Sequence, residues 1–434
     1  MRVTGRSWRS VGGWLLVLGA IVAAACSPAA QQTAISPLAT YTPTAAVQVV
    51  AFVTAAPSAV TALTPGSNVT PTPTPLGASE TSPAAAVLTG TVAPGVAVTV
   101  PVTASLSGAL ATPIPTSAPI VFPPRPPNEN PLTGLIVDDP TVLQRRPIHV
   151  RVGNDVAARP QAGLSAADLV YEEIVEWWVT RYTAIYLSQS PEVVAPIRSA
   201  RLINCQLTQQ YNAALSNSGG SDGVRWELSK LPIVNLDEYF WPQPYFYRPN
   251  EGWQTRLALN VKQARQLMAK KGLEANVPLR GFVFSDTPPA GEPAQTIYIP
   301  YPKRTSIVEW RYDPGAGRYL RWVQGQPLID VTNKTQISAA NVIIYYAEHQ
   351  ETNIVEDSNG ATSIRIIVNG EGRAQVFRDG IVVEGRWRAE GNQTPEFLFP
   401  NGEAIPLKRG NSWIEVVPPK YQVLINATPT PAAG

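Results

Sequence analysis

The chain has 434 residues, with 43 prolines, 2 cysteines, 2 histidines and a formal net charge of +2. This near-neutral balance argues against a polybasic nucleic-acid-binding protein, and we expect no nucleic-acid partner. The scarcity of histidine excludes HExxH zinc sites and histidine-rich metal cages, and no cofactor is evident.

The N-terminus has the pattern of a secretory signal peptide over residues 1–25. Its first ten residues carry three arginines and no acid, and an apolar run from Trp14 to Ala25 follows. A positive segment before a short apolar segment is typical of export signals. The run is too short to span a bilayer core, which needs ~20 apolar residues.

The apolar run ends in the sequence VAAAC, whose last residue is Cys26. It resembles a bacterial lipobox, although Ala23 stands where such motifs usually have a large aliphatic residue. The resemblance implies lipidation of Cys26 and anchoring at the extracytoplasmic face of the cell membrane, because several acyl chains make anchoring stable. The alternative is ordinary cleavage after Ala25, which leaves a free thiol.

Residues 26–127 consist mostly of Ala, Thr, Pro, Val and Ser, and Glu80 and Arg125 are their only charged residues. Such a segment has no periodic apolar face from which to build a core, so we expect a disordered stalk. Its proline-rich parts should extend by ~3.1 Å per residue. A second disordered tail is expected over residues 427–434.

The composition becomes globular at about residue 128, and about 300 residues suggest two domains. The first, over residues 128–275, mixes strands and helices and is expected to be α/β or α+β. RPIHVRVGND alternates apolar and polar residues and predicts a half-buried strand, and DLVYEEIVEWW and VTRYTAIYLS predict two more. A helix is expected to start near Ser199, and a second over residues 260–271.

The second domain, over residues 276–426, is expected to be β-rich. Its short apolar segments are separated by the turn sequences YDPGAGRY, NGEG, RDG, PNGEA and KRGN. Short strands at such regular spacing predict a sandwich or a barrel-like unit. No catalytic motif occurs in it, and GEGRAQVFRDG reads as a hairpin sequence.

Ten segments of the chain, in the same order as in the family, resemble the YerB-like bacterial lipoprotein family. Together they extend through both expected domains. In the first domain they are NPLTG (130–134), ARPQAGLSAADLVYEEIVE (158–176), TRYTAIY (180–186), APIRSAR (195–201) and SGGS (218–221). In the second they are YDPGAGRYLRW (312–322), GQPLIDVTN (325–333), NVII (341–344), GEGRAQVFRDGIVVEGRWR (370–388) and LKRGNSWIEVVP (407–418). The resemblance implies a two-domain lipoprotein whose biochemical function is not established.

The chain departs from this family at two positions. Family members often have a histidine shortly before the GGS sequence, where this chain has Asn217. They often have His-Asn where this chain has Pro249 and Asn250. If those histidines are catalytic in the family, this chain lacks them.

Arg181, Arg198 and Arg201 form the candidate anion-binding set. APIRSAR places two guanidinium groups three residues apart at an expected strand-to-helix junction, where free backbone N–H groups also favour an anion. Guanidinium forks match phosphate and carboxylate groups. The alternative is that these arginines pair with nearby acids and brace the fold.

A candidate polar loop site comprises Asn154, Gly219, Gly220, Ser221 and Asn250. The two glycines allow close backbone approach, and Ser221 can cap the helix that follows. We favour the capping role over a nucleophilic Ser221, because no activating base is evident.

Asp168 and Glu172 are weak candidates for holding Mg²⁺ through water molecules. On a strand, Glu172 and Glu176 should share one face and Glu173 the other. Salt-bridged or solvated carboxylates are the commoner case for such a set.

Aromatic residues concentrate at Trp177 and Trp178 and again over residues 238–253. Mixed with Pro, Arg and Asn, they can form a platform for sugar rings or a peptide. The alternative is a loop packed on the core.

Two functional hypotheses follow. The favoured one is a non-enzymatic module, tethered through Cys26, that binds a cell-wall polymer or an envelope protein. The other is a phosphotransferase acting on glycopolymers carried by polyprenyl pyrophosphate, because the order of segments is faintly similar to the LytR–CpsA–Psr enzymes. In that reading the arginines grip the pyrophosphate beside Mg²⁺, and a long apolar cavity for the lipid tail should lie next to them.

Overall fold

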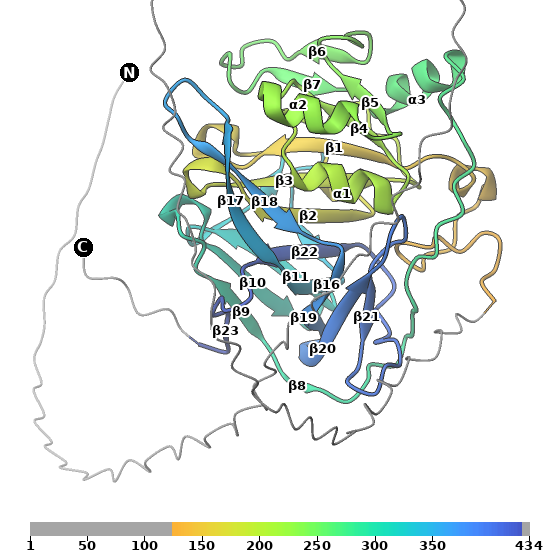
Figure 1. Cartoon of the computed structure of the whole chain (residues 1–434). Helices are drawn as coiled ribbons and strands as arrows, with labels where there is room; N and C mark the ends of the chain where they lie inside the picture. The colour runs from red at the N-terminus through yellow and green to blue at the C-terminus, as the bar shows by residue number, and fades with distance from the viewer. Residues whose placement is uncertain (1–123, 428–434) are drawn as a thin grey trace, which may run out of the picture. The chain divides into compact units, whose positions relative to one another are not determined.

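The structure is a computed structural model that describes residues 124–427 (Figure 1). The expected signal peptide, Cys26, almost all of the stalk and the tail from residue 428 lie outside the described residues. The described part belongs to one compact unit. Strands dominate it, as predicted for the second domain, and its three α-helices all precede residue 271.

The largest element is an eleven-stranded sheet that crosses the whole described chain (Figure 1). In spatial order its strands are β21 (Glu396–Leu398), β20 (Ile381–Ala389), β19 (Gly370–Arg378), β16 (Asn341–Tyr346), β22 (Ser412–Val417), β2 (Leu169–Ile174), β3 (Thr180–Tyr186), β1 (Ile148–Gly153), β4 (Ala214–Asn217) and β5 (Val234–Asp237), with β8 (Glu292–Pro293) paired to β20. The expected hairpin GEGRAQVFRDG is confirmed as β19 and β20.

A six-stranded sheet and three strand pairs complete the β structure. The six-stranded sheet contains β12 (Gln326–Pro327), β11 (Arg318–Val323), β10 (Val308–Asp313), β9 (Thr296–Ile299) and β23 (Leu424–Ile425), with β15 (Ser338–Ala339) paired to β11. The pairs are β6 (Tyr245–Tyr247) with β7 (Leu257–Leu259), β13 (Ile329–Asp330) with β14 (Thr335–Gln336), and β17 (Glu348–Val355) with β18 (Thr362–Ile367).

The α-helices are α1 (Ile203–Gln210), α2 (Asp222–Ser229) and α3 (Val261–Lys270). The five 3-10 segments are η1 (Pro140–Leu143), η2 (Val156–Ala158), η3 (Leu164–Ala166), η4 (Glu176–Trp178) and η5 (Arg304–Ser306). The predicted cap at Ser221 is confirmed, because its side chain accepts from the Val224 N–H. The Asn260 side chain likewise accepts from the Gln263 N–H and caps α3.

The predicted start of the first helix near Ser199 is wrong, because α1 begins at Ile203. The preceding residues are held in a loop by contacts to neighbouring strands: the Arg198 N–H donates to the Arg151 carbonyl, and the Ala200 N–H donates to the Gly219 carbonyl. These long-range hydrogen bonds override the local preference for helix.

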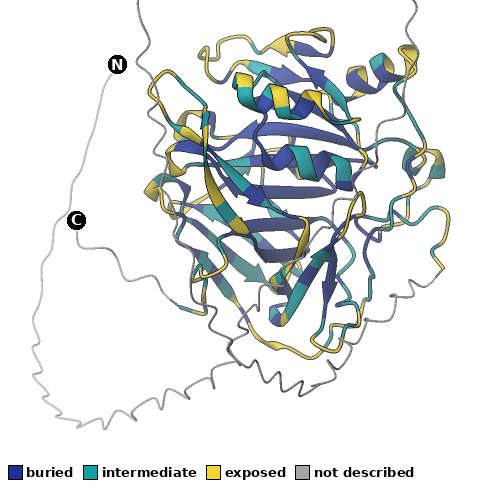
Figure 2. Cartoon of the chain, in the orientation of Figure 1, coloured by how far each residue is buried: buried dark blue, intermediate teal, exposed yellow. Residues whose placement is uncertain are grey.

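The prediction that β1 is half buried is also wrong, because all six of its residues are buried. Its polar face lies under α1, where His149 makes an edge contact with Tyr211 at 5.2 Å between ring centroids. Figure 2 shows this central part of the sheet as buried along its length.

The two domains share the eleven-stranded sheet. Strands β1 to β5 come from the first domain, and β8, β16 and β19 to β22 from the second. The join is the parallel pairing of β2 with β22, which aligns Leu169 with Ser412 and Glu173 with Val416. The domain boundaries at residues 128, 275 and 426 stay predictions, and the backbone continues without a break across them.

Both faces of the large sheet are covered. On one face the six-stranded sheet contributes Trp310 to a core that includes Trp413 of β22, with 5.4 Å between ring centroids. On the other face, Leu207 of α1 and Ile366 of β18 pack in a second core with Tyr171 of β2. The β-rich part thus forms a two-sheet sandwich, and this sandwich extends under the first domain.

Candidate functional site

Several of the predicted site residues follow the carboxyl ends of parallel strands. Strand β4 runs parallel to both β1 and β5, and β2 points the same way because β3 is antiparallel to β1 and to β2. Asn154, Glu176, the 218–221 loop and Glu238 therefore follow β1, β2, β4 and β5 along one edge of the sheet. In open sheets with parallel strands, this edge is where ligands usually bind.

Two of the predicted arginines meet on one carboxylate at this edge. The Arg181 guanidinium donates to Glu176 at 2.6 Å, and Arg201 Nε donates to the other oxygen of Glu176 at 2.6 Å. Arg201 also forms an ion pair with Glu356, at 3.3 Å. Burial by itself raises the pKa of Glu176, but the two guanidinium groups outweigh it and lower the pKa to about 2.

The third predicted arginine is held apart from the other two. Arg198 pairs with Asp155 at 3.0 Å and donates to the Gln254 carbonyl. All three guanidinium groups thus have protein acceptors, which matches the bracing alternative. The anion site stays a prediction, and a ligand there would have to compete with these carboxylates.

The glycine loop has a clear structural role. Gly219 has a positive φ of 68°, its N–H donates to Asp237 at 3.1 Å, and its carbonyl accepts from the Asn217 side chain at 2.9 Å. Ser221 caps α2 directly afterwards. Asn250 does not join this loop, because it lies exposed in the connection between β6 and β7.

The weak metal candidates are not brought together. Asp168 precedes β2, where it accepts from Asn130 Nδ2 and from the backbone N–H groups of Leu187 and Ser188. Glu172 lies four residues further along the strand, about 13 Å away at ~3.3 Å per residue. Within residues 124–427, no group of three or more His, Cys, Asp and Glu side chains is arranged to hold a metal ion.

The prediction that Glu172 and Glu176 lie on the same face of the strand is wrong. Glu176 lies beyond the end of β2, in η4, where it turns toward Arg181 and Arg201. Glu172 points to the opposite face, under the six-stranded sheet, where it binds Arg321. The alternation of a strand no longer applies once the chain leaves the strand.

The buried group around Arg321 was missed by sequence reasoning. Arg321 of β11 lies between Glu172 of β2 and Glu415 of β22, and all three side chains are fully buried. Glu415 also accepts from Tyr301 at 2.9 Å and from the Trp310 indole N–H at 2.8 Å. No local signal reveals this network, since Arg321 lies 94 residues from Glu415 and 149 residues from Glu172 along the chain.

Six exposed aromatic side chains form what we call the aromatic surface, around α2, the loop after β5 and the β6–β7 hairpin. They are Trp226, Tyr239, Phe240, Phe246, Tyr247 and Trp253. Trp253 is 77% exposed and Tyr239 is 75% exposed. The alternative in which the 238–253 loop packs on the core is wrong for these side chains, although Tyr245 and Trp241 do pack on it.

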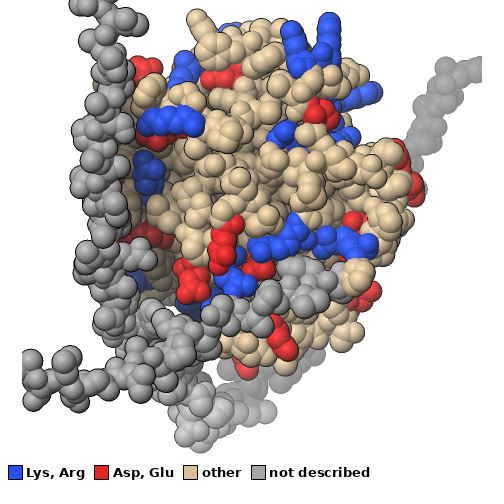
Figure 3. All heavy atoms as spheres, turned by 45° about the vertical axis from the view of Figure 1, so that its right-hand side comes forward, with Lys and Arg blue, Asp and Glu red and all other residues tan. Residues whose placement is uncertain are grey.

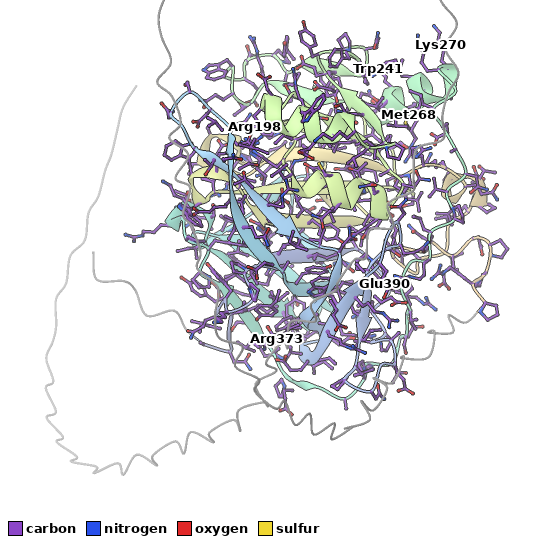
Figure 4. All side chains as sticks on the ribbon, viewed as in Figure 1. Arg198, Trp241, Met268, Lys270, Arg373 and Glu390 are labelled. Atoms are coloured by element: carbon purple, nitrogen blue, oxygen red, sulfur yellow. The ribbon has the colours of Figure 1, made fainter. Side chains whose placement is uncertain are left out.

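Cations accompany the aromatic rings of this region. Arg225 lies 5.7 Å from the Tyr239 ring centroid, Lys230 lies 5.1 Å from that of Trp226, and Arg256 lies 4.4 Å from that of Tyr247. Residues 222–271 hold eight basic and five acidic side chains. Lys and Arg side chains project at the upper end of the molecule in Figure 3, and Figure 4 shows Lys270 and Trp241 there.

A small cavity of about 200 Å³ lies beside Glu176. Its walls come from η4 and the β17–β18 hairpin and include Trp177 and Trp178. Pockets for drug-sized ligands measure ~300–1,000 Å³. A cavity of this size does not favour the polyprenyl phosphotransferase hypothesis, which expects a long apolar cavity next to the arginines.

Two further findings concern the described residues only. Cys205 is a free cysteine, and burial, followed by the charge of Glu227, raises the pKa of its thiol to about 11. A thiol of this kind is a poor nucleophile at neutral pH. No helix within residues 124–427 is long and apolar enough to cross a membrane.

Comparison with known proteins shows to which family the chain belongs. The two families described as "Protein of unknown function (DUF3048)", N-terminal and C-terminal domain, match residues 132–274 and 297–414. The chain is 32% identical over 296 residues to the protein named "Putative lipoprotein YerB" of Bacillus subtilis (strain 168), covering 66% of this chain and 86% of that protein.

A solved structure agrees with this match. The crystal structure of the YerB protein from Bacillus subtilis superposes with a TM-score of 0.60 at 26% sequence identity, covering 68% of this chain and 98% of the other. The resemblance read from the sequence is confirmed over both domains. The chain therefore belongs to the two-domain DUF3048 family of YerB-like proteins.

Proposed function

We propose that this chain is a membrane-anchored extracytoplasmic binding module that holds an anionic polymer of the cell envelope on its aromatic surface. The anchor is the lipid on Cys26. The name of the Bacillus relative, a lipoprotein, and the sequence VAAAC support the anchor. The aromatic surface is the observation that carries the binding function.

Exposed aromatic rings at this density are costly unless a partner covers them. Contiguous apolar patches on soluble proteins usually mark binding faces. Flat rings such as those of Trp253 and Tyr239 offer stacking area for sugar rings at a low cost in conformational entropy, since each side chain has only two rotatable bonds. Arg225, Lys230 and Arg256 place positive charge beside these rings, and an anionic polymer would compete with Asp237 for Arg225 and with Glu227 for Lys230.

The arginines at the sheet edge have a different role in this proposal. Arg181 and Arg201 hold Glu176 in η4, whereas Arg198 holds Asp155 and donates to the Gln254 carbonyl, which fixes the loop that carries Trp253 of the aromatic surface. A rigid support keeps the exposed rings in place and lowers the entropy lost on binding.

The test is cosedimentation of the full chain with insoluble wall polymer that has been stripped of protein and lipid. We expect saturable binding that weakens with rising salt, because exposed charges are screened. The double variant Tyr239→Ser, Trp253→Ser should weaken binding at least tenfold, or about 1.4 kcal/mol. Ile136→Ser, at a residue that is 60% exposed and lies outside the aromatic surface, is the control and should bind like the parent.

Two outcomes would count against the proposal. Unchanged binding by the double variant would remove the aromatic surface from the function. Binding only to wall material that still contains protein would make the partner an envelope protein. The anchor is tested separately: Cys26→Ser should move the chain from the membrane fraction to the soluble fraction.

A further inference from the structure

The turn between β2 and β3 holds two adjacent tryptophans in left-handed backbone conformation. Trp177 has a φ of 61° and Trp178 a φ of 60°. Hairpin turns with two positive φ values normally use Asn and Gly, and a bulky residue in this region is strained. The indoles are 52% and 50% exposed, so burial does not fully offset that strain. Strain kept at exposed side chains indicates a role for the side chains themselves.

Both indoles line the cavity of about 200 Å³ beside Glu176. The Trp177 indole N–H donates to Asp357 Oδ2 at 2.7 Å, which ties the turn to the tip of the β17–β18 hairpin. At the inner wall, Glu176 is held by Arg181 and Arg201. The cavity is therefore formed by rigid contacts from both domains.

The opposite wall carries an unpaired negative charge. Glu351 of β17 is exposed and lines the cavity, and its carboxylate has no ion pair or hydrogen bond within residues 124–427. Both charged side chains that line the cavity, Glu176 and Glu351, are acidic, and Glu176 already shares its charge with Arg181 and Arg201. The field in the cavity therefore favours a cation.

From this geometry we propose that the cavity binds an organic ammonium group. A cation within about 6 Å of an indole face is attracted by the ring, and a carboxylate on the facing wall adds a Coulomb attraction. The volume suits a headgroup or the end of a side chain, since it lies below the ~300 Å³ at which drug-sized pockets begin. This site is separate from the aromatic surface and does not rest on the proposed function.

The ammonium group has two possible chemical sources, a quaternary ammonium compound and a primary amine of lysine type. We would titrate the full chain by isothermal calorimetry with choline and with Nα-acetyl-lysine methylamide. The neutral isostere of choline, 3,3-dimethylbutan-1-ol, is the control ligand. We expect one of the two cations to bind and the neutral alcohol to bind about tenfold more weakly or not at all.

The variants separate this site from a structural role of the same residues. Glu351→Gln should lower the affinity for the cation about threefold to tenfold. The stability of the protein should not change, because the side chain is exposed. Trp178→Leu should lower the affinity for the cation about tenfold. Glu348→Gln, exposed on the same strand but outside the cavity, should change nothing.

Each result decides between the alternatives. Preference for choline assigns a quaternary ammonium ligand, and preference for the lysine amide assigns a primary amine. Equal binding of the neutral alcohol, no saturable heat with either cation, or an unchanged dissociation constant for Glu351→Gln would overturn the proposal.

Discussion

Replacing Glu415 by Gln should remove much of the pH dependence of the stability of this protein near neutral pH. Glu415 and Glu172 share one guanidinium, that of Arg321, in a site where all three side chains are fully buried. One positive charge cannot balance two buried negative charges, so one carboxyl is expected to keep its proton. Burial, and then the charge of Glu172, raises the pKa of Glu415 from 4.5 to about 8.

The sign of the effect follows from proton counting. Between about pH 4.5 and pH 8 the folded protein holds the Glu415 proton and the unfolded chain does not, so the free energy of unfolding falls as the pH rises. One pKa unit corresponds to about 1.4 kcal/mol, so the loss over this window is on the order of 3–5 kcal/mol. Glutamine cannot ionise, and its amide oxygen can still accept from the Trp310 indole N–H.

The assay is urea unfolding of parent and variant at pH 5, 6, 7 and 8. The free energy of unfolding of Glu415→Gln should rise relative to that of the parent with each step to higher pH. Because the two proteins are compared at the same pH, the contributions of all other titrating groups cancel. Glu384→Gln, an exposed residue paired with Arg373, is the control and should follow the parent. Parallel curves for parent and Glu415→Gln would refute the assignment of the shared proton.

Three further predictions concern single positions, each measured by urea unfolding. Glu176→Gln should lower the free energy of unfolding by about 3–5 kcal/mol, because it leaves Arg181 and Arg201 without the carboxylate charge that they share; a loss below ~1 kcal/mol would contradict the bracing role. Ser221→Ala should lower the free energy of unfolding by ~1 kcal/mol, because it removes the cap of α2, whereas Ser221→Asp retains a capping oxygen and should keep the parent's stability. Gly281→Ala should lower the free energy of unfolding by at least ~2 kcal/mol, because φ is +69° and the added Cβ would clash with the backbone oxygen of Pro131; near-parent stability would show that the backbone here can shift.

The joined sheet changes how the two family domains should be pictured. The pairing of β2 with β22 and the contacts of Arg321 with Glu172 and Glu415 place backbone and side-chain contacts directly across the domain boundary. Independent motion of the two domains would break a sheet and expose a buried charge. The cavity walled by Trp178 and Glu351 also draws on both domains.

The sequence was sufficient where the signal is local. The cap at Ser221, the hairpin of β19 and β20, and the helix over 261–270 depend on neighbouring residues alone. The exposed aromatic residues of the 238–253 segment were also found as a candidate surface, because a run of aromatic and polar residues is visible in the sequence.

Only the tertiary structure decided which residues meet. The sequence left open whether Arg181 and Arg201 bind an anion or pair with nearby acids, and the structure places Glu176 between them. The burial of β1 depends on α1 covering its polar face. In the network of Glu172, Arg321 and Glu415, Arg321 lies 94 residues from Glu415 and 149 residues from Glu172 along the chain. Charge pairing and burial depend on distance in space, and sequence patterns report only the few residues that lie next to one another along the chain.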